Sequence, residues 1–261
     1  MDQSGGGAGR DPALGAALDR LGAQLNRARA RLVEELKTSA GLREELRHME
    51  LRALQSQINP HFLFNTLAAI NAQATLDTAP ATSRLVLALS RLLRYNLRRL
   101  QDTVPLSEEV AAVRDYLLIQ QARFEGRLTV EIKVAGDVAA TPVPVLSIQP
   151  LVENAVLHGL EGRDDGRLRL VGRRRGEEAE IVVSDNGRGM SAARLREVLR
   201  QKEAGSGLAH TTGLGIYSVD RRIKYYFGSE YGLRLTSRPG RGTSATLRLP
   251  YAAGVREGEE P

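Results

Sequence analysis

The stretch "IQPLVENAVLHG" (Ile148–Gly159) places a glutamate, an asparagine and a histidine within an apolar run. We expect a helix from about Val145 to Leu160, in which Asn154 and His158, four residues apart, share one face. Polar side chains flanked by leucines and valines need buried partners or a ligand. An amide oxygen is a suitable ligand for Mg2+, which binds chiefly through phosphates. The stretch therefore predicts a polar site on a buried helix.

A second polar group follows a strand in "VSDNGRGM" (Val183–Met190). Asp185 comes at the end of the strand, and Gly187 and Gly189 leave the following backbone bare enough for a ligand to approach. A carboxylate held at a strand end can accept a hydrogen bond from an exocyclic amine such as that of adenine. The letters "DNG" are equally typical of an ordinary turn between strands, so this motif alone leaves both interpretations open.

A glycine-rich segment, "HTTGLGIYSVDRR" (His210–Arg222), leads into a helix predicted from Leu214 to Phe227. Backbone N–H groups at Gly213 and Gly215 could cradle a phosphate at the start of that helix, although a plain helix start fits equally well. Residues 190–212, which include Lys202, have the composition of a mobile lid whose cation would meet a phosphate.

Alternating apolar residues predict strands on both sides of these motifs, at 127–134, 167–173, 179–185, 233–238 and 243–250. Helices and short strands mixed without strict alternation indicate an α+β sandwich, with a mixed sheet covered by helices on one face. In "SRPGRGTSATLRLP" (Ser237–Pro250), Gly240 and Gly242 form a tight turn and Thr243 begins the last strand. No "GxxxxGK[ST]" motif occurs, so a nucleotide would not be held by a P-loop.

The N-terminal part of the chain is predicted to be helical. Leucines at heptad spacing indicate a coiled coil, and two later apolar helices joined at "TAPATS" form a hairpin. One hairpin cannot cover its own apolar stripe, so we expect two copies to form a four-helix bundle. Pro105 ends the hairpin, and Ser107, followed by Glu108 and Glu109, is expected to cap the next helix. The predicted organisation is a disordered start, a coiled coil, a dimerising hairpin, an α/β domain and a disordered tail, at 1–12, 13–41, 42–104, 105–251 and 252–261.

The hairpin contains an unusual stretch, "SQINPHFLFN" (Ser56–Asn65). Pro60 has no N–H to donate, so it opens or kinks the helix just before His61. A neutral imidazole is a nitrogen nucleophile at cellular pH and can attack a γ-phosphoryl group in line. Asn65 lies one helical turn later, where it can orient the ring. Phe62 and Phe64 are interpreted as packing anchors; the alternative is that His61 itself only packs against them.

Together and in this order, the motifs resemble those of the GHKL ATP-binding domain: "LVENAVLHG" is similar to its N box, "DNGRG" to its G1 box, "TGLG" to its G2 box and "GRGTSATLRLP" to its closing strands. With "LQSQINPHFLFNTLAAI" and "YLLIQQARFEGRL", the chain resembles sensor histidine kinases of the LytS/YehU type. The resemblance covers roughly residues 51–250.

This resemblance implies a homodimeric kinase that uses ATP and Mg2+ to phosphorylate His61, assisted by Asn65, and then passes the phosphate to an aspartate of a response regulator. It implies that Asp185 reads adenine with support from Thr243, and that Asn154 holds Mg2+. The remaining ATP-binding positions implied are glycines of the base pocket and lid hinges and two phosphate contacts: Gly187, Gly189, Gly213, Gly215, His158 and Lys202.

The residue after His61 departs from the pattern of many histidine kinases, which have an acidic residue there. This chain has Phe62. Glu153 is the candidate base by its position in the family motif, and solvent is the alternative. The departure also leaves open a second function, a catalytically silent ATP-binding scaffold that signals through lid closure.

Composition limits the other possibilities. The 261 residues carry 37 Lys+Arg against 31 Asp+Glu but few aromatic residues, so we expect an arginine-rich solvated surface rather than a nucleic-acid-binding one. The absence of cysteine excludes disulfides and thiolate metal sites. No stretch is long and apolar enough for a membrane span or a signal peptide, so we expect a cytoplasmic chain. Its input would come from a soluble signal, from a separate sensor or membrane subunit, or from a sensor segment outside this chain.

Overall fold

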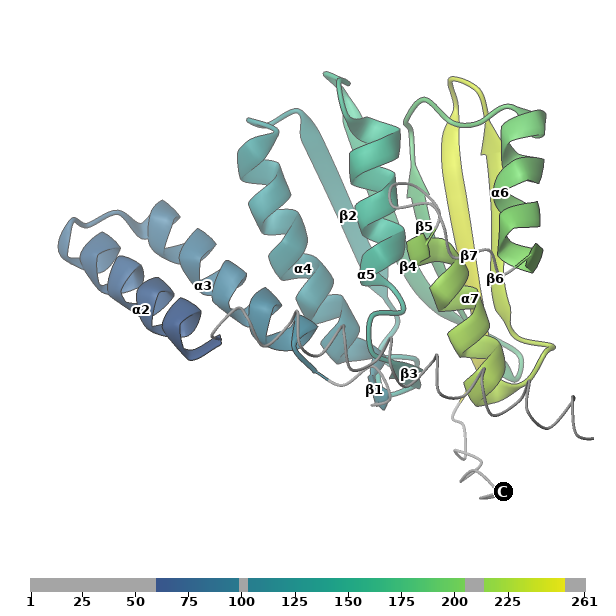
Figure 1. Ribbon diagram of the computed structural model, residues 1–261, viewed down its shortest axis with the longest axis horizontal. Coiled ribbons are helices and arrows are strands. Elements are labelled where there is room, and N and C mark those ends of the chain that lie inside the picture. Colours follow the sequence, from purple (N-terminus) through teal and green to yellow (C-terminus); the bar gives the residue numbers. More distant parts are fainter. Residues whose placement is uncertain (1–59, 99–102, 205–213, 252–261) are drawn as a thin grey trace, which may run out of the picture. The chain divides into compact units, whose positions relative to one another are not determined.

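The computed structural model describes residues 60–98, 103–204 and 214–251. The predicted coiled coil and the two predicted disordered ends lie outside these ranges. The chain divides into two compact units, Met1–Asn65 and Thr66–Pro261. The second unit holds most of the described residues, and Figure 1 shows its elements.

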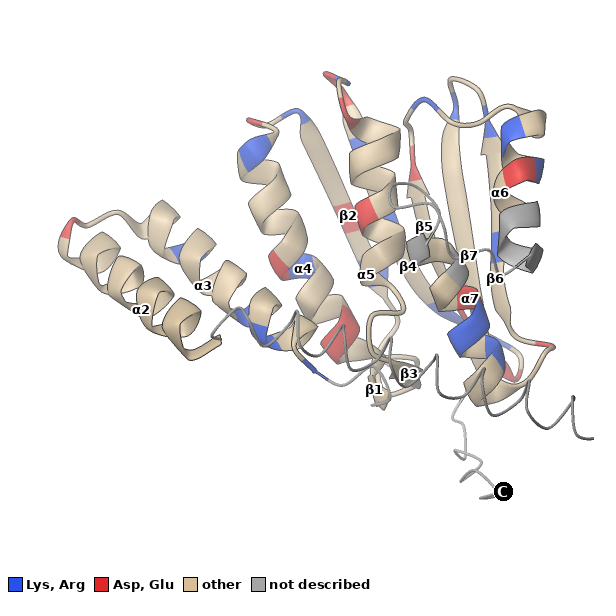
Figure 2. Cartoon of the chain, in the orientation of Figure 1, with Lys and Arg blue, Asp and Glu red and all other residues tan. Residues whose placement is uncertain are grey.

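The hairpin predicted from the apolar periodicity consists of α2 (Pro60–Leu76) and α3 (Pro80–Asn96). Thr78, in the connecting turn, has a positive φ of 48°. Beyond the turn, the Ser83 hydroxyl donates a hydrogen bond of 2.7 Å to Asn71 Oδ1. Helix α2 contains no charged residue, as Figure 2 shows, yet Ala74 is its only buried residue. Among the residues that the structure describes, most of the apolar surface of α2 is therefore left uncovered.

A five-stranded mixed sheet forms the centre of the second unit, as the strand patterns predict. Its strands lie in the order β2-β4-β5-β7-β6. Only β2 and β4 run parallel, and the other neighbours are antiparallel. The strands are β2 (Leu128–Val134), β4 (Gly166–Arg175), β5 (Glu178–Asp185), β6 (Gly232–Arg238) and β7 (Gly242–Pro250).

Helices cover one face of this sheet (Figure 1). They are α4 (Leu106–Arg123), α5 (Gln149–Asn154) with the π-helix η1 (Ala155–Leu160), α6 (Ala192–Ala204) and α7 (Leu214–Phe227). Strand β4 shows the two faces directly, because Leu168 and Leu170 are buried whereas Arg167 and Arg169 are exposed. The predicted α+β sandwich is thus confirmed.

Two stretches of the chain differ from the sequence predictions, and the start of α4 is a third. The expected helix over 145–160 begins only at Gln149 and continues as a π-helix, because β3 (Pro142–Pro144) pairs with β1 (Thr103–Pro105) before it. Residues 192–204 of the predicted lid form helix α6.

The predicted cap of α4 is wrong. Helix α4 begins at Leu106 after Pro105, with no side-chain cap, and the backbone N–H of Ser107 donates to Ala139 O. Glu109 does not face solvent at the start of the helix but is completely buried. Its carboxylate binds groups that are distant in sequence, which a capping pattern cannot reveal.

Candidate functional site

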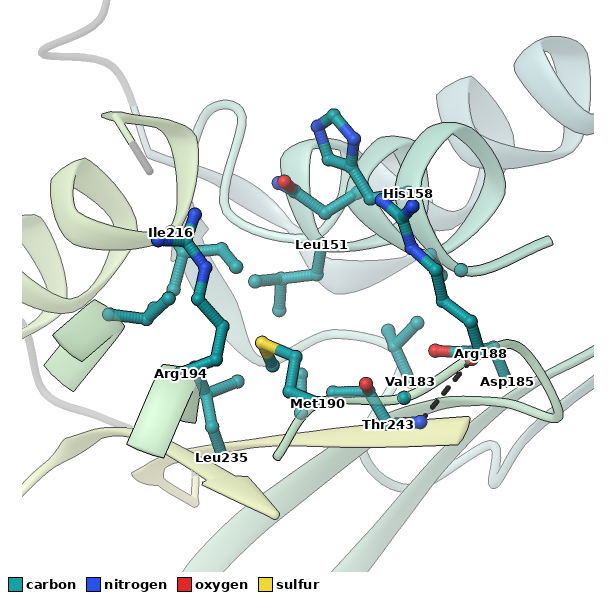
Figure 3. Close-up of a pocket in the computed structure, with 16 residues that line it drawn as sticks. Leu151, His158, Val183, Asp185, Arg188, Met190, Arg194, Ile216, Leu235 and Thr243 are labelled. Atoms are coloured by element: carbon teal, nitrogen blue, oxygen red, sulfur yellow. Dashed lines mark hydrogen bonds between the residues drawn. The ribbon is translucent and has the colours of Figure 1, made fainter. Parts of the chain in front are cut away.

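A cleft lies between the sheet and its covering helices. Figure 3 shows Asp185 and Thr243 on the sheet side of the cleft, opposite Leu151 and His158 on the helices. Its lining is mostly apolar, with a few polar side chains, as is usual for sites that bind small molecules. The polar side chains that line it are Asn154, His158, Asp185, Arg188, Arg194 and Thr243.

Asp185 ends β5 and is fixed by backbone donors. Its Oδ1 atom accepts hydrogen bonds from Gly187 N at 2.8 Å and from Thr243 N at 3.3 Å. Burial raises the pKa of this carboxyl group, and the two backbone hydrogen bonds partly offset the effect. Within the described residues no hydrogen bond to Oδ2 occurs, so this oxygen can accept one from a ligand.

Two glycines allow the π-helix to approach Asp185 closely. A Cβ atom on Gly159 would lie 2.8 Å from Asp185 Oδ1, and one on Gly187 would overlap the carbonyl group of Gly159. That carbonyl accepts a hydrogen bond of 3.1 Å from Arg188 N. Bare backbone is therefore needed at both positions. The sequence indicated this for Gly187, whereas Gly159 was not singled out because its contact partners are more than twenty residues away.

Thr243 is linked to the loop after Asp185 by a serine that the sequence analysis missed. Ser237 Oγ lies 2.9 Å from Thr243 Oγ1 and accepts a hydrogen bond of 2.8 Å from Met190 N. The serine therefore ties β6, β7 and the loop at Met190 together at the edge of the cleft. Its place in a strand, with no motif around it, gave no signal.

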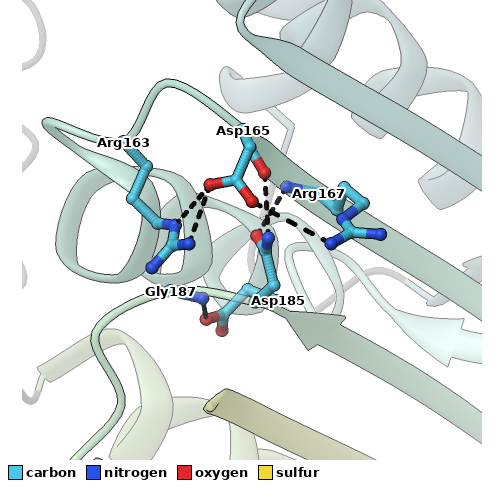
Figure 4. Close-up of polar contacts among 6 residues, drawn as sticks. Arg163, Asp165, Arg167, Asp185 and Gly187 are labelled. Carbon is cyan, nitrogen blue, oxygen red and sulfur yellow. Dashed lines mark hydrogen bonds and ion pairs between the residues drawn. The ribbon is translucent and has the colours of Figure 1, made fainter. Parts of the chain in front are cut away.

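The loop that follows Asp185 is also fixed by polar contacts with residues 165–167 (Figure 4). Asn186 Oδ1 accepts a hydrogen bond of 2.7 Å from Arg167 N, and Asn186 Nδ2 donates one of 2.8 Å to Asp165 O. The Arg163 guanidinium, hydrogen-bonded to Asp165, lowers the pKa of that exposed carboxyl group. Asn186 is thus more than a turn residue, because its side chain fixes the start of the loop that carries Gly187.

The helix side of the cleft brings together Asn154 and His158, as their spacing predicts. Asn154 Nδ2 donates a hydrogen bond of 2.6 Å to Pro150 O, which leaves its Oδ1 atom for a ligand. The π-helix begins at the next residue, and such segments are common at functional sites. Glu153 does not line the cleft, and its carboxylate accepts a hydrogen bond of 2.8 Å from Gln149 Nε2.

Three of the predicted nucleotide contacts, at Lys202, Gly213 and Gly215, lie in or beside the part of the chain that the structure does not describe. Lys202 lies in α6 and Gly215 in the first turn of α7, but their local surroundings are not described. Gly213 lies outside the described residues. Gly189 lines the cleft and has a φ of 62°, so a side chain there would be strained.

His61 and Asn65 form a separate polar pair in the first turns of α2. Both side chains are exposed, and Asn65 Nδ2 lies 3.3 Å from His61 Nδ1. An amide carries both a donor and an acceptor, so Asn65 can hold either tautomer of the imidazole ring. The predicted orienting role of Asn65 is consistent with this geometry.

Two family models match the chain. Residues 49–128 match the model described as "Histidine kinase", and residues 145–253 match "Histidine kinase-, DNA gyrase B-, and HSP90-like ATPase". The chain therefore carries a histidine kinase segment followed by an ATPase domain of this type. The second match spans the cleft residues of this chain from Leu151 to Ala245, and the first includes His61 and Asn65.

Curated relatives carry the same description. The chain is 35% identical to sensor histidine kinase BtsS of Escherichia coli (strain K12) over 90% of its own length and 40% of that protein. It is 36% identical to sensor histidine kinase YesM of Bacillus subtilis (strain 168) over 78% of its own length and 34% of that protein. The chain thus spans well under half the length of these relatives.

The solved histidine kinase domain of a blue-light activated histidine kinase from Erythrobacter litoralis EL346 is 17% identical, with a TM-score of 0.41, over 74% of this chain and 94% of that one. In the part of the chain that the structure describes, no helix is both long and apolar enough to cross a membrane.

Proposed function

We propose that this chain is the kinase core of a two-component sensor histidine kinase, and that it transfers the γ-phosphoryl group of ATP to His61. An imidazole nitrogen attacks the γ-phosphorus, the bond between that phosphorus and the bridging oxygen breaks, and ADP leaves. The other ring nitrogen then gives up its proton to a base, and neutral phosphohistidine results. The phosphoryl group then passes to an aspartate carboxylate on the receiver domain of a response regulator.

The observation that most directly supports ATP as the substrate is the state of the Asp185 carboxylate. One oxygen is held by two backbone N–H groups, while Oδ2 accepts no hydrogen bond from the described residues and belongs to a side chain lining an apolar cleft. An adenine ring fits this combination, because its faces are apolar and its exocyclic amine donates a hydrogen bond. Thr243 and the close-packed glycines then support the base, with Gly213 and Gly215 as proposed hinges of a lid.

The triphosphate is proposed to lie toward the helix side of the cleft, where Asn154 and His158 line it. Mg2+ would be held by the phosphates and by Asn154 Oδ1, the amide oxygen left without a hydrogen bond among the described residues. When bound, the ion neutralises charge that develops on the phosphoryl oxygens. Lys202 is proposed as a second phosphate contact.

The proton acceptor for His61 follows from the same geometry. The neighbouring side chain is Phe62, which cannot accept a proton, and Glu153 is bonded to Gln149 instead of lining the cleft. Glu153 could act as a base only if that hydrogen bond opened. We therefore propose solvent as the acceptor, with Asn65 selecting the ring orientation that presents a nitrogen lone pair.

The organisation proposed for the chain follows the sequence boundaries. Residues 13–41 form a signalling coiled coil, 42–104 the dimerising hairpin with His61, and 105–251 the ATP-binding domain. The uncovered apolar surface of α2 supports a homodimer formed through the hairpin. The input reaches the coiled coil from a separate sensor or from a sensor segment outside this chain.

The test is to incubate the protein and its His61→Gln variant with Mg2+ and γ-labelled ATP and to treat the labelled product with acid and alkali. We expect label on the wild type only, lost in acid and retained in alkali, as for phosphohistidine. ATP binding without any label would instead support the silent scaffold, for which the absence of an acidic residue after His61 is the favouring observation.

A further inference from the structure

A buried carboxylate in α4 lies outside the cleft and has no part in the proposed chemistry. Glu109 is completely buried. Its carboxylate accepts a hydrogen bond from the Tyr95 hydroxyl of α3, one of 2.5 Å from Leu146 N and one of 2.7 Å from Ile148 N. One side chain thus joins the second helix of the hairpin to the turn that follows β3.

The same turn is held from the opposite direction by α7. The Arg222 guanidinium donates a hydrogen bond of 2.6 Å to Val145 O and one of 3.2 Å to Leu146 O. Leu146 therefore has its N–H bound by a carboxylate and its C=O by a guanidinium. Burial lowers the pKa of Arg222, and the negative charge of Glu109 offsets part of this lowering.

The backbone of this turn is strained. Leu146 has a φ of 61°, a left-handed conformation that branched and bulky residues rarely adopt. Such a conformation persists only when the surrounding contacts determine it. Within the turn, Ser147 Oγ donates a hydrogen bond of 2.6 Å to Pro144 O. The polar contacts that reach the turn from other elements come from Glu109 and Arg222, so we expect its shape to depend on both side chains.

The turn leads directly into the helix that carries the proposed Mg2+ ligand. Ile148, whose N–H is bound by Glu109, is the N-cap of α5, and Asn154 is the last residue of that helix. Only six residues separate the turn from Asn154, and they form one continuous helical segment, so we expect movement of residues 145–148 to move Asn154. On its other side, Arg222 belongs to the helix that follows the proposed lid segment.

We propose that Tyr95, Glu109 and Arg222 form a clamp in which Glu109 is a positioning residue for the nucleotide site, so that the placement of α3 sets the affinity for ATP. This inference rests on the proposed function, because it takes the cleft to bind ATP and α3 to belong to the hairpin that carries the input. The coupling runs from α3 through the Tyr95 hydroxyl to the 145–148 turn, and from the turn through α5 to Asn154.

A matched control lies on the same pair of helices. The Arg91 guanidinium of α3 binds the Asp115 carboxylate of α4 through hydrogen bonds of 2.8 and 2.5 Å. This ion pair also fastens α3 to α4, but it makes no contact with the 145–148 turn. A general loosening of α3 would therefore follow from either Tyr95→Phe or Arg91→Gln, whereas the clamp is broken only by Tyr95→Phe.

The first experiment measures the Kd of the full chain for ATP with Mg2+ in the wild type, Tyr95→Phe and Arg91→Gln, each well below its unfolding temperature. We expect Tyr95→Phe to raise the Kd about fivefold or more, the lower end of typical couplings between sites, and Arg91→Gln to stay within about twofold. Equal Kd values in all three proteins, or equal weakening in both variants, would overturn the clamp.

A double-variant cycle tests whether Tyr95 and Arg222 act through one turn. If they do, Tyr95→Phe combined with Arg222→Gln should bind ATP about as weakly as the weaker single variant. Effects that multiply would show that the two side chains act independently and would contradict the proposal.

A measurement on the wild type covers the case in which Arg222→Gln does not fold. Coupling is reciprocal, so ATP should slow hydrogen exchange at the Leu146 and Ile148 amides. The comparison is the Ser107 amide, which is bonded to Ala139 O outside the clamp. Unchanged exchange at Leu146 and Ile148 would overturn the clamp. These readouts require ATP binding but not phosphoryl transfer. A chain that binds ATP without labelling His61 would refute the proposed kinase activity and leave the test of the clamp intact. A chain that binds no ATP would refute both the proposed function and the clamp.

Discussion

At the scale of single residues, Gly159 decides whether Asp185 can take its place in the cleft. A methyl group there would lie 2.8 Å from Asp185 Oδ1, so Gly159→Ala has to displace the carboxylate. We expect the affinity for ATP to fall about tenfold or more, since the loss of one good hydrogen bond is of the order of 1 kcal/mol or slightly above. Titration with a fluorescent ATP analogue measures this.

The control for this substitution is Gly136→Ala. Gly136 also lies in a loop, but a Cβ atom there meets nothing within 4 Å and its φ is not in the left-handed region. The Gly136→Ala variant should bind ATP with the same affinity as the wild type. Equal affinities in both variants would mean that Asp185 does not need its observed position.

The Asp185 carboxylate should lower the stability of the folded protein while it is required for ATP binding. Burial raises the pKa of its carboxyl group in the folded protein, so the stabilising contribution is complete below the unfolded pKa and is lost as the pH rises through the folded pKa. Asp185→Asn avoids the buried charge and keeps an oxygen that can accept from Gly187 N and Thr243 N. We expect ATP binding to be lost while the unfolding midpoint at pH 7 rises by the order of a few degrees.

The pH dependence identifies the cause of that gain. The difference in midpoint between Asp185→Asn and the wild type should shrink as the pH falls toward 4, because the wild-type carboxyl group then becomes neutral as well. Thermal unfolding followed by circular dichroism from pH 4 to pH 8 tests this. A difference that does not change with pH would point to packing instead of charge.

The residues of the cleft were predictable to the extent that their signals are local. Asp185 at a strand end and Asn154 and His158 at helical spacing follow from sequence patterns, and the structure places all three on one cleft. Ser237 and Gly159 could not be found in that way, because their roles come from contacts with Met190 and Asp185, which are distant along the chain.

At the scale of secondary-structure elements, the strands were predicted closely because their alternation is strong. The predicted strand over 233–238 and the predicted helix from Leu214 to Phe227 match β6 and α7. The π-helix and the pairing of β1 with β3 could not be predicted. Three-residue strands with prolines have no periodicity, and a π-helix differs from an α-helix by tertiary contacts rather than by composition.

Helix α2 leads to a prediction about the phosphorylation step. Asn65 is one helical turn from His61, with its Nδ2 atom 3.3 Å from the ring. Asn65→Ala removes this contact but retains a strong helix former, so α2 should persist. We expect the initial rate of His61 labelling to fall about tenfold through loss of orientation, with the Kd for ATP unchanged.

Gln73→Ala is the matched control on the same helix, because it removes another exposed amide that bonds only Asp77 among the contacts described. Its labelling rate should equal that of the wild type. A similar loss of rate in both variants would attribute the effect to the hairpin as a whole and not to the orientation of His61.

At the scale of the whole molecule, the distribution of charge separates the two surfaces of the chain. The uncovered face of the sheet carries arginines that pair with acidic neighbours across strands, such as Arg169 with Glu131 and Arg248 with Glu178. The hairpin helix α2 has no charge over 17 residues (Figure 2). The first surface is suited to water, whereas the second is the surface that the sequence analysis expects a second copy of the hairpin to cover.

The prediction is that two chains associate through the hairpin. Ile70 of α2 is 44% exposed in the single chain, and its burial in a four-helix bundle would be worth about 2 kcal/mol. Ile70→Glu places the change twice in a symmetric dimer, so the association should weaken by at least about 4 kcal/mol, or roughly a thousandfold in Kd.

Leu157→Glu is the control, because Leu157 is similarly exposed, at 39%, but lies on the π-helix of the nucleotide domain. Sedimentation velocity over a range of concentrations should show a dimer for the wild type and for Leu157→Glu and a monomer for Ile70→Glu. ATP binding should survive in that monomer, because every residue lining the cleft lies between Leu151 and Ala245, outside the hairpin. A dimer that persists in Ile70→Glu would mean that the apolar surface of α2 is covered by something other than a second copy of the hairpin.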